Sequence, residues 1–218
     1  MTTSYAISLW QFNSAALAGG GYGTQAGTFL IDIIFGILTF IVMFRFLLQL
    51  ARADFRNPLS QAIVKMSNPM LKPFRRIIPG FAGIDFASIV VMFLLVMIKL
   101  SLTLLIADSF SVLQFRIGFG PDTTTGILRM VVASVFILLD SAIWIYIFAI
   151  IILAIASWIV QGGYNPVLAL LYQLTNPVMQ PIRRIMPTAA GIDFSPLVAI
   201  IILMLIQMAF PYLMRSLI

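Results

Sequence analysis

The ionisable side chains of this sequence are few in type. All seven acidic residues are Asp, and Cys, His and Glu do not occur. This excludes zinc sites built on Cys or His, thiol catalysis and a Ser-His-Asp triad within the chain. We therefore expect no catalytic residue, no cofactor and no metal site. An Asp/Ser hydrolase is the enzymatic alternative that the composition leaves open.

Four charged side chains, Asp32, Arg45, Lys99 and Asp140, lie in or near long apolar runs. A charge at the centre of a bilayer costs about 2.5–3.5 kcal/mol on insertion scales, so each should be paired or close to an interface. At about 1.5 Å of rise per helical residue, the Lys99 side chain can reach toward Asp32. We predict a contact between these two, either as a structural pair or as part of an ion path.

Two arginine pairs, Arg75-Arg76 and Arg183-Arg184, each stand in a Pro-x-Arg-Arg-Ile segment. The simplest interpretation is that they anchor the topology by contacting lipid headgroups. The alternative is a binding surface, in which these four arginines donate to anionic lipid or to an acidic segment of a partner protein.

The elements that position these side chains are expected to be membrane-spanning helices. Hydrophobic residues make up 61% of the chain and charged residues 9%, which is far from the average of soluble domains. A run of about 20 apolar residues can cross a bilayer. Four such runs occur, at 29–50, 86–107, 127–160 and 196–214. The third is longer than one crossing requires, so it is either one long helix or a bent one.

An internal duplication organises the chain. Displacing the sequence by 108 positions superposes two copies of one motif and also places Asp32 on Asp140. The motif positions are Asn57, Pro58, Asn68, Pro69, Pro73, Pro79, Gly83 and Asp85 in the first copy, and Asn165, Pro166, Asn176, Pro177, Pro181, Pro187, Gly191 and Asp193 in the second. The predicted fold is therefore all-α, with four transmembrane helices arranged as two parallel helix–loop–helix repeats.

The predicted domains follow from the duplication. They are an uncharged extracytoplasmic segment at 1–28, a first repeat at 29–107, an extracytoplasmic spacer at 108–136 and a second repeat at 137–215. Each repeat contains two crossings, so the repeats are related by an axis along the membrane normal. At position 207 of the second repeat Gln replaces the Lys99 of the first.

Each loop is predicted to contain an amphipathic helix. Asn57 and Asn165 are suitable N-caps, each followed by Pro at the first helical position. Apolar residues then recur at helical spacing, as Leu59, Ala62, Ile63 and Met66 in the first copy and Val167, Leu170, Leu171 and Leu174 in the second.

The later motif residues are expected to shape the end of each loop. Asn68 and Asn176 are predicted to cap a second short segment, which Pro73 or Pro181 should break or kink. Asp85 and Asp193 should then lie at the N-terminal ends of spanning helices, where negative charge is favoured.

The basic residues predict the orientation. The loops at 51–83 and 161–192 contain most of the Lys and Arg, whereas Arg116 and Arg215 lie on the opposite side. The positive-inside rule then makes both loops cytoplasmic and both termini extracytoplasmic. We interpret the net charge of +6 as contact with anionic lipid headgroups and not as nucleic-acid binding.

The doubled pattern Asn-Pro, Asn-Pro, Pro-x-Arg-Arg-Ile and Gly-Ile-Asp-Phe resembles the YggT family of small bacterial and plastid membrane proteins. The second copy, ending in Ser195-Pro196, is closer to the family form than the first, which has Ala87-Ser88 there. The resemblance implies a bacterial cytoplasmic (inner) membrane location. It also implies links to osmotic-stress tolerance, cell division or envelope organisation and, in plastid relatives, to assembly of membrane complexes.

Two functions from different classes fit these patterns. The first is a non-enzymatic scaffold or assembly factor that uses the repeated loops to bind unidentified membrane or cytoplasmic proteins together with anionic lipids. A homo-oligomer is one option for its assembly. The second is a small ion transporter or channel component, which the intramembrane charges and the duplication suggest.

Overall fold

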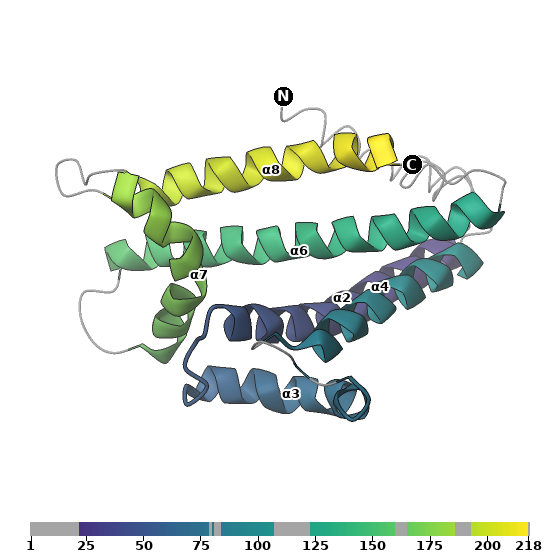
Figure 1. Ribbon diagram of the computed structural model, residues 1–218, viewed down its shortest axis with the longest axis horizontal. Coiled ribbons are helices and arrows are strands. Elements are labelled where there is room, and N and C mark those ends of the chain that lie inside the picture. Colours follow the sequence, from purple (N-terminus) through teal and green to yellow (C-terminus); the bar gives the residue numbers. More distant parts are fainter. Residues whose placement is uncertain are drawn as a thin grey trace. The chain divides into compact units, whose positions relative to one another are not determined.

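A computed structural model describes residues 22–78, 80, 84–106, 123–159, 165–185 and 193–217. Within these ranges the regular structure is helical, as predicted (Figure 1). The helices are α2 (Tyr22–Leu50), α3 (Pro58–Arg75), α4 (Phe86–Ile106), α6 (Thr123–Ile159), α7 (Pro166–Ile185) and α8 (Ser195–Leu217). Four predicted motif residues, Pro79, Gly83, Pro187 and Gly191, lie outside the described residues.

Four of the helices are long and apolar enough to cross a membrane, which confirms the predicted number. Their apolar spans are Tyr22–Leu50, Phe86–Ile106, Gly126–Ser157 and Ser195–Met214. α2 begins seven residues before the predicted run, because Thr24, Gln25 and Ala26 are compatible with a helix although they are less apolar. α6 is continuous over 37 residues, so the third apolar run forms one long helix.

The chain divides into two compact units. Unit 1 includes residues 22–39, 93–106 and 123–135 of the described chain. Within it, Gly27 lets α2 approach α4 closely, because a Cβ there would lie 3.3 Å from the Ile106 side chain. Ser134, in the first half of α6, contacts Met97 of α4, with 3.2 Å between Oγ and Sδ.

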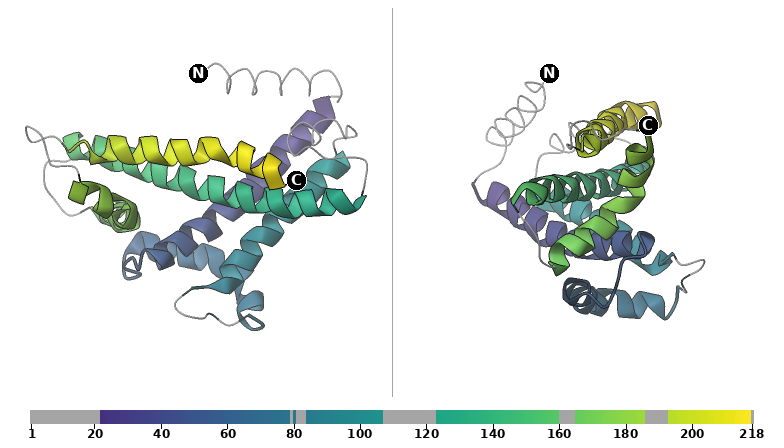
Figure 2. Two further views of the ribbon diagram at one scale, coloured as in Figure 1. Left: turned by 45° about the horizontal axis from the view of Figure 1, so that its top comes forward. Right: turned by 90° about the vertical axis from the view of Figure 1, so that its left-hand side faces the viewer.

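Unit 2 includes residues 40–92 and 136–217. Its apolar core joins α6, α7 and α8 through five buried side chains: Ile147, Ile150, Met179, Ala199 and Leu203. Figures 1 and 2 show α6 and α8 side by side, with α7 crossing near one end of them. α7 is amphipathic as predicted, since Leu170, Leu171 and Leu174 of the expected stripe are buried.

α3 is also present, but its buried face is not the expected apolar stripe. Its buried residues are Ser60, Ser67 and Leu71, whereas Met66 of the stripe is 54% exposed. The physical reason is Arg45 of α2, whose buried guanidinium hydrogen-bonds to Ser67 and therefore draws the polar face of α3 inward.

The prolines bend the loop helices without ending them. α3 continues through Pro69 and Pro73, and α7 continues through Pro177 and Pro181. The prediction that Asn68 and Asn176 cap separate second segments is therefore wrong. Figure 1 shows each helix changing direction along its length, as expected where Pro removes a backbone donor. Buried Leu71 and Met179 hold the segments beyond the first prolines in place.

Candidate functional site: the duplicated loop helices

The two loop helices begin with the same capping structure. The Asn57 side-chain oxygen accepts a hydrogen bond from the Leu59 N–H at 2.9 Å, and the Asn165 oxygen accepts one from the Val167 N–H at the same distance. Pro58 and Pro166 occupy the first helical positions, where the missing N–H has no cost. Both predicted caps are thus confirmed.

The same region joins the two loops to each other. The Asn57 side-chain NH₂ group donates to the Pro166 carbonyl at 2.6 Å, and the Asp54 backbone N–H donates to Gln173 Oε1 at 2.7 Å. Asn57 is buried. The loops of the two repeats are therefore in direct contact. Sequence reasoning missed this second role of Asn57, because a capping asparagine uses only its oxygen and nothing in the pattern indicates an acceptor for the nitrogen.

Replacing Asn57 with Asp tests the inter-loop bond. The carboxylate can still cap α3, but it cannot donate to Pro166, so we expect a loss of about 1–2 kcal/mol in the free energy of unfolding. Asn165→Asp is the matched control and should cost less, because Asn165 is an exposed cap. Thermal unfolding of the detergent-solubilised protein measures both. Equal destabilisation would contradict a joining role for Asn57.

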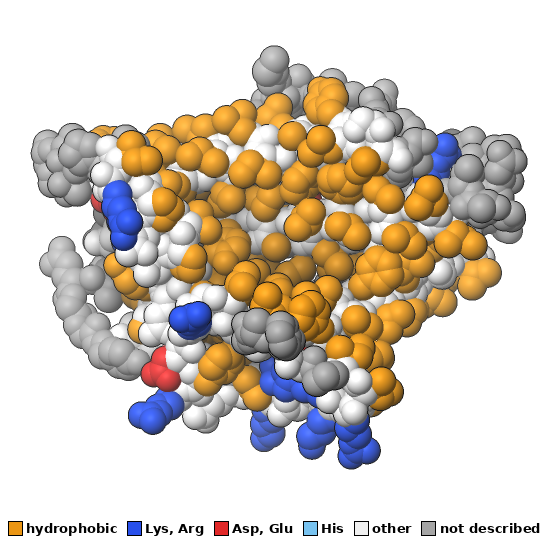
Figure 3. All heavy atoms as spheres, in the orientation of Figure 1, with side chains coloured by type: hydrophobic (Ala, Val, Ile, Leu, Met, Phe, Trp, Pro, Cys, Tyr) orange, Lys and Arg blue, Asp and Glu red, His pale blue; other side chains and the backbone are white. Residues whose placement is uncertain are grey.

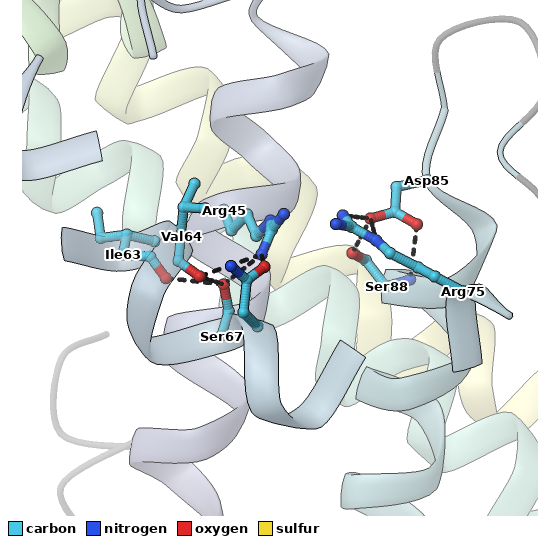
Figure 4. Close-up of polar contacts among 8 residues, drawn as sticks. Arg45, Ile63, Val64, Ser67, Arg75, Asp85 and Ser88 are labelled. Atoms are coloured by element: carbon cyan, nitrogen blue, oxygen red, sulfur yellow. Dashed lines mark hydrogen bonds and ion pairs between the residues drawn. The ribbon is translucent and has the colours of Figure 1, made fainter. Parts of the chain in front are cut away.

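The first arginine of the first pair is bound within the protein. Arg75 Nε donates to Asp85 Oδ2 at 3.1 Å, and Arg75 Nη2 donates to the same oxygen (Figure 4). Ser88 Oγ lies 2.7 Å from that oxygen. Burial alone would raise the pKa of Asp85, but the hydrogen bonds from Arg75 and Ser88 outweigh it and hold the pKa below its usual value. Asp85 thus serves as an ionised cap at the start of α4, as predicted.

The second repeat has the same pair in a more exposed setting. Arg183 Nε lies 3.2 Å from Asp193 Oδ2, and both side chains are 37% exposed. Burial would raise the pKa of Asp193, but hydrogen bonds from Ser195 and the charge of Arg183 lower it below its usual value. Arg183 also donates to the Tyr172 hydroxyl at 3.2 Å. Neither ion pair was predicted from the sequence, although the displacement by 108 positions superposes them.

The four arginines are therefore not equivalent. Arg75 and Arg183 bind carboxylates, whereas Arg76 and Arg184 are exposed and form no ion pair within the described part of the chain. On the face shown in Figure 3, Lys and Arg side chains gather over α3, which includes the exposed Lys65 and Lys72. The binding role of the arginines stays a prediction, and Arg76 and Arg184 are the pair available for it.

Intramembrane polar contacts also repeat. Lys99 Nζ lies 2.8 Å from Asp32 Oδ1, which confirms the predicted contact. At the equivalent place in the second repeat, Gln207 Nε2 donates to Asp140 Oδ1 at 2.6 Å. Among the described residues, no group of three His, Cys, Asp or Glu side chains could hold a metal ion.

These features define a class: a multi-pass membrane protein made of a duplicated helix–loop–helix, with an asparagine-capped loop helix in each copy. A family model described as CCB3/YggT matches two segments of equal length, residues 24–106 and 132–214. The second segment begins 108 positions after the first, which is the displacement of the repeated motif. The chain belongs to this family.

Relatives are similar over most of the chain. The uncharacterized protein PA0392 of Pseudomonas aeruginosa is 37% identical over 84% of this chain and 87% of its own length. The uncharacterized protein YggT of Escherichia coli K12 is 33% identical over 83% and 87%. An uncharacterized protein of Vibrio alginolyticus is 39% identical over 80% and 87%. No solved structure matches the chain.

Proposed function

We propose that this protein is a non-enzymatic scaffold or assembly factor whose binding surface is formed by α3 and α7 together. The observation that supports this most directly is the pair of hydrogen bonds that join the loops, from Asn57 to Pro166 and from Asp54 to Gln173. A surface built jointly by two repeats is larger and more rigid than either loop alone, and preorganisation of this kind reduces the entropic cost of binding.

The same surface presents matching apolar and cationic groups. Ile77 and Ile185, which follow the exposed arginines, are both 81% exposed. An exposed isoleucine beside an unpaired arginine, present twice, offers burial of apolar area together with a charged hydrogen-bond donor. Acidic protein segments with apolar anchors, and anionic lipids, are the expected ligands.

The proposed location is the bacterial cytoplasmic membrane, with both loops cytoplasmic and both termini extracytoplasmic. Arg129, near the start of α6, adds a third basic residue to the opposite side beside Arg116 and Arg215, and the bias still favours cytoplasmic loops. Family resemblance suggests a role in osmotic-stress tolerance, envelope organisation or cell division.

Crosslinking followed by affinity recovery from native membranes tests the scaffold. The double variant Arg76→Gln/Arg184→Gln should reduce specific protein crosslinks at least tenfold, because these arginines are the unpaired ones of their pairs. The control Arg52→Gln/Arg56→Gln removes the same charge from exposed positions of the first loop and should preserve the profile. A profile unchanged in both variants would leave the arginines as topology anchors and contradict the proposal. Protease protection of the loops verifies insertion.

Transport is the second candidate, and the repeated polar contacts within the spans favour it. Ion flux into proteoliposomes distinguishes the two functions. A reproducible ion leak that Asp32→Asn abolishes would favour a transporter or channel component. No ion flux in either the wild type or the variant would favour the scaffold.

A further inference from the structure

Arg45 is a buried arginine that has no carboxylate partner in the part of the chain that the structure describes. It lies five residues before the end of α2 and is 7% exposed. Its Nη1 donates to Ser67 Oγ and Asn68 Oδ1, both at 2.8 Å, and to the Val64 carbonyl at 3.4 Å. All three acceptors are neutral, so they fix the position of the guanidinium without neutralising its charge.

Two donor atoms of Arg45 remain for a ligand, because Nε and Nη2 have no acceptor among the described residues. Figure 4 shows the guanidinium groups of Arg45 and Arg75 pointing toward each other. Arg75 uses Nε and Nη2 on Asp85, and its Nη1 makes no hydrogen bond within the described chain.

The charges of this cluster do not balance. Arg45, Arg75 and Asp85 lie together in Figure 4, and these two arginines and one aspartate have one excess positive charge. A buried guanidinium is costly unless it is paired with an anion. Two guanidinium groups with unused donors match the tetrahedral oxygens of a phosphate better than a single carboxylate.

We infer that Arg45 and Arg75 form a phosphate-binding site at the loop-side end of α2, distinct from the exposed surface of the proposed scaffold. The ligand is a phosphate group, from an anionic lipid headgroup or free in solution. At about 1.5 Å per residue, Arg45 lies about 7.5 Å from the loop-side end of α2. The site belongs to the first repeat alone, because Leu153 stands at the position equivalent to Arg45.

Binding to the purified full-length protein tests the site. One arm titrates phosphatidylglycerol, with zwitterionic phosphatidylethanolamine for comparison, and counts bound lipids by native mass spectrometry. The other arm adds inorganic phosphate and follows its ³¹P line width. The variants are Arg45→Lys, which keeps the charge but loses the fork, and Arg45→Leu, which copies the second repeat. Arg56→Gln, an exposed position of the same loop, is the matched control.

The expected result is at least tenfold weaker binding by both Arg45 variants and unchanged binding by Arg56→Gln. A loss confined to phosphatidylglycerol identifies the lipid headgroup, and a loss confined to inorganic phosphate identifies the free ion. If Arg45→Leu fails to fold, as judged by gel filtration and thermal unfolding, Arg45→Lys provides the test. Equal affinity in wild type, Arg45→Lys and the control, or no saturable binding in either arm, would overturn the inference.

Discussion

Replacing Asp85 with Ala is expected to lower the free energy of unfolding by about 2–3 kcal/mol. Removing one partner of a fully buried ion pair costs about 3–5 kcal/mol, and the value here is smaller because the Arg75 side chain is 35% exposed. The change also removes the acceptor for Ser88, which is buried beside it. Thermal unfolding in detergent, followed by circular dichroism at 222 nm, measures the effect.

The second repeat provides the control for this experiment. Asp193→Ala removes the equivalent carboxylate from a pair in which both side chains are 37% exposed, so the expected loss is at most about 1 kcal/mol. Equal destabilisation by the two changes would show that burial does not distinguish the pairs. No effect of either would show that the ion pairs are not formed in the detergent-solubilised protein.

The Asp85 effect should depend on pH in a defined direction. Because the folded-state pKa of Asp85 is lowered, its ionised form stabilises the protein above the unfolded pKa of about 3.9. That contribution is lost as the pH falls through the lowered folded-state pKa. The difference in Tm between wild type and Asp85→Ala should therefore be constant near neutral pH and shrink below about pH 4. A difference that grows on acidification would contradict this linkage.

The sequence was sufficient to predict the features that depend on a local pattern or on the repetition of a motif 108 positions later. Long apolar runs determine the spanning helices, because only helices satisfy their own backbone hydrogen bonds in lipid. Asn-Pro determines the start of each loop helix through the side-chain cap. The Asp32–Lys99 contact was predictable because an intramembrane charge has few possible partners.

Features that depend on tertiary packing were not predictable. Hydrophobic periodicity indicated an apolar buried face in both loop helices, but the buried Arg45 favours polar contacts for α3. Arg75 was assigned to external ligands and Asp85 to the α4 terminus, since the turn that brings them together leaves no periodic signal. Prolines would otherwise end α3 and α7, but the burial of Leu71 and Met179 keeps these helices continuous.

Replacing Lys99 with Leu is expected to impair membrane insertion or folding strongly. The Asp32 carboxylate would then lie within an apolar span without its cation, at a cost of about 2.5 kcal/mol, the lower end of the insertion range because Asp32 lies about one turn inside the apolar run at 29–50 and not at its centre. The inserted, correctly folded fraction, measured by protease protection and by gel filtration of the solubilised protein, should fall several-fold.

Lys99→Gln should be far milder, because it reproduces the contact that the second repeat already uses between Gln207 and Asp140. The double variant Asp32→Asn/Lys99→Leu should recover most of the inserted, folded fraction that Lys99→Leu loses, because it removes the unpaired carboxylate along with its partner. Such a recovery indicates direct coupling between the two side chains. If Lys99→Leu and Lys99→Gln behave alike, or if the double variant is no better than Lys99→Leu, the pair does not stabilise the first repeat. The polar contact would then need another explanation, and an ion path would be the one to test.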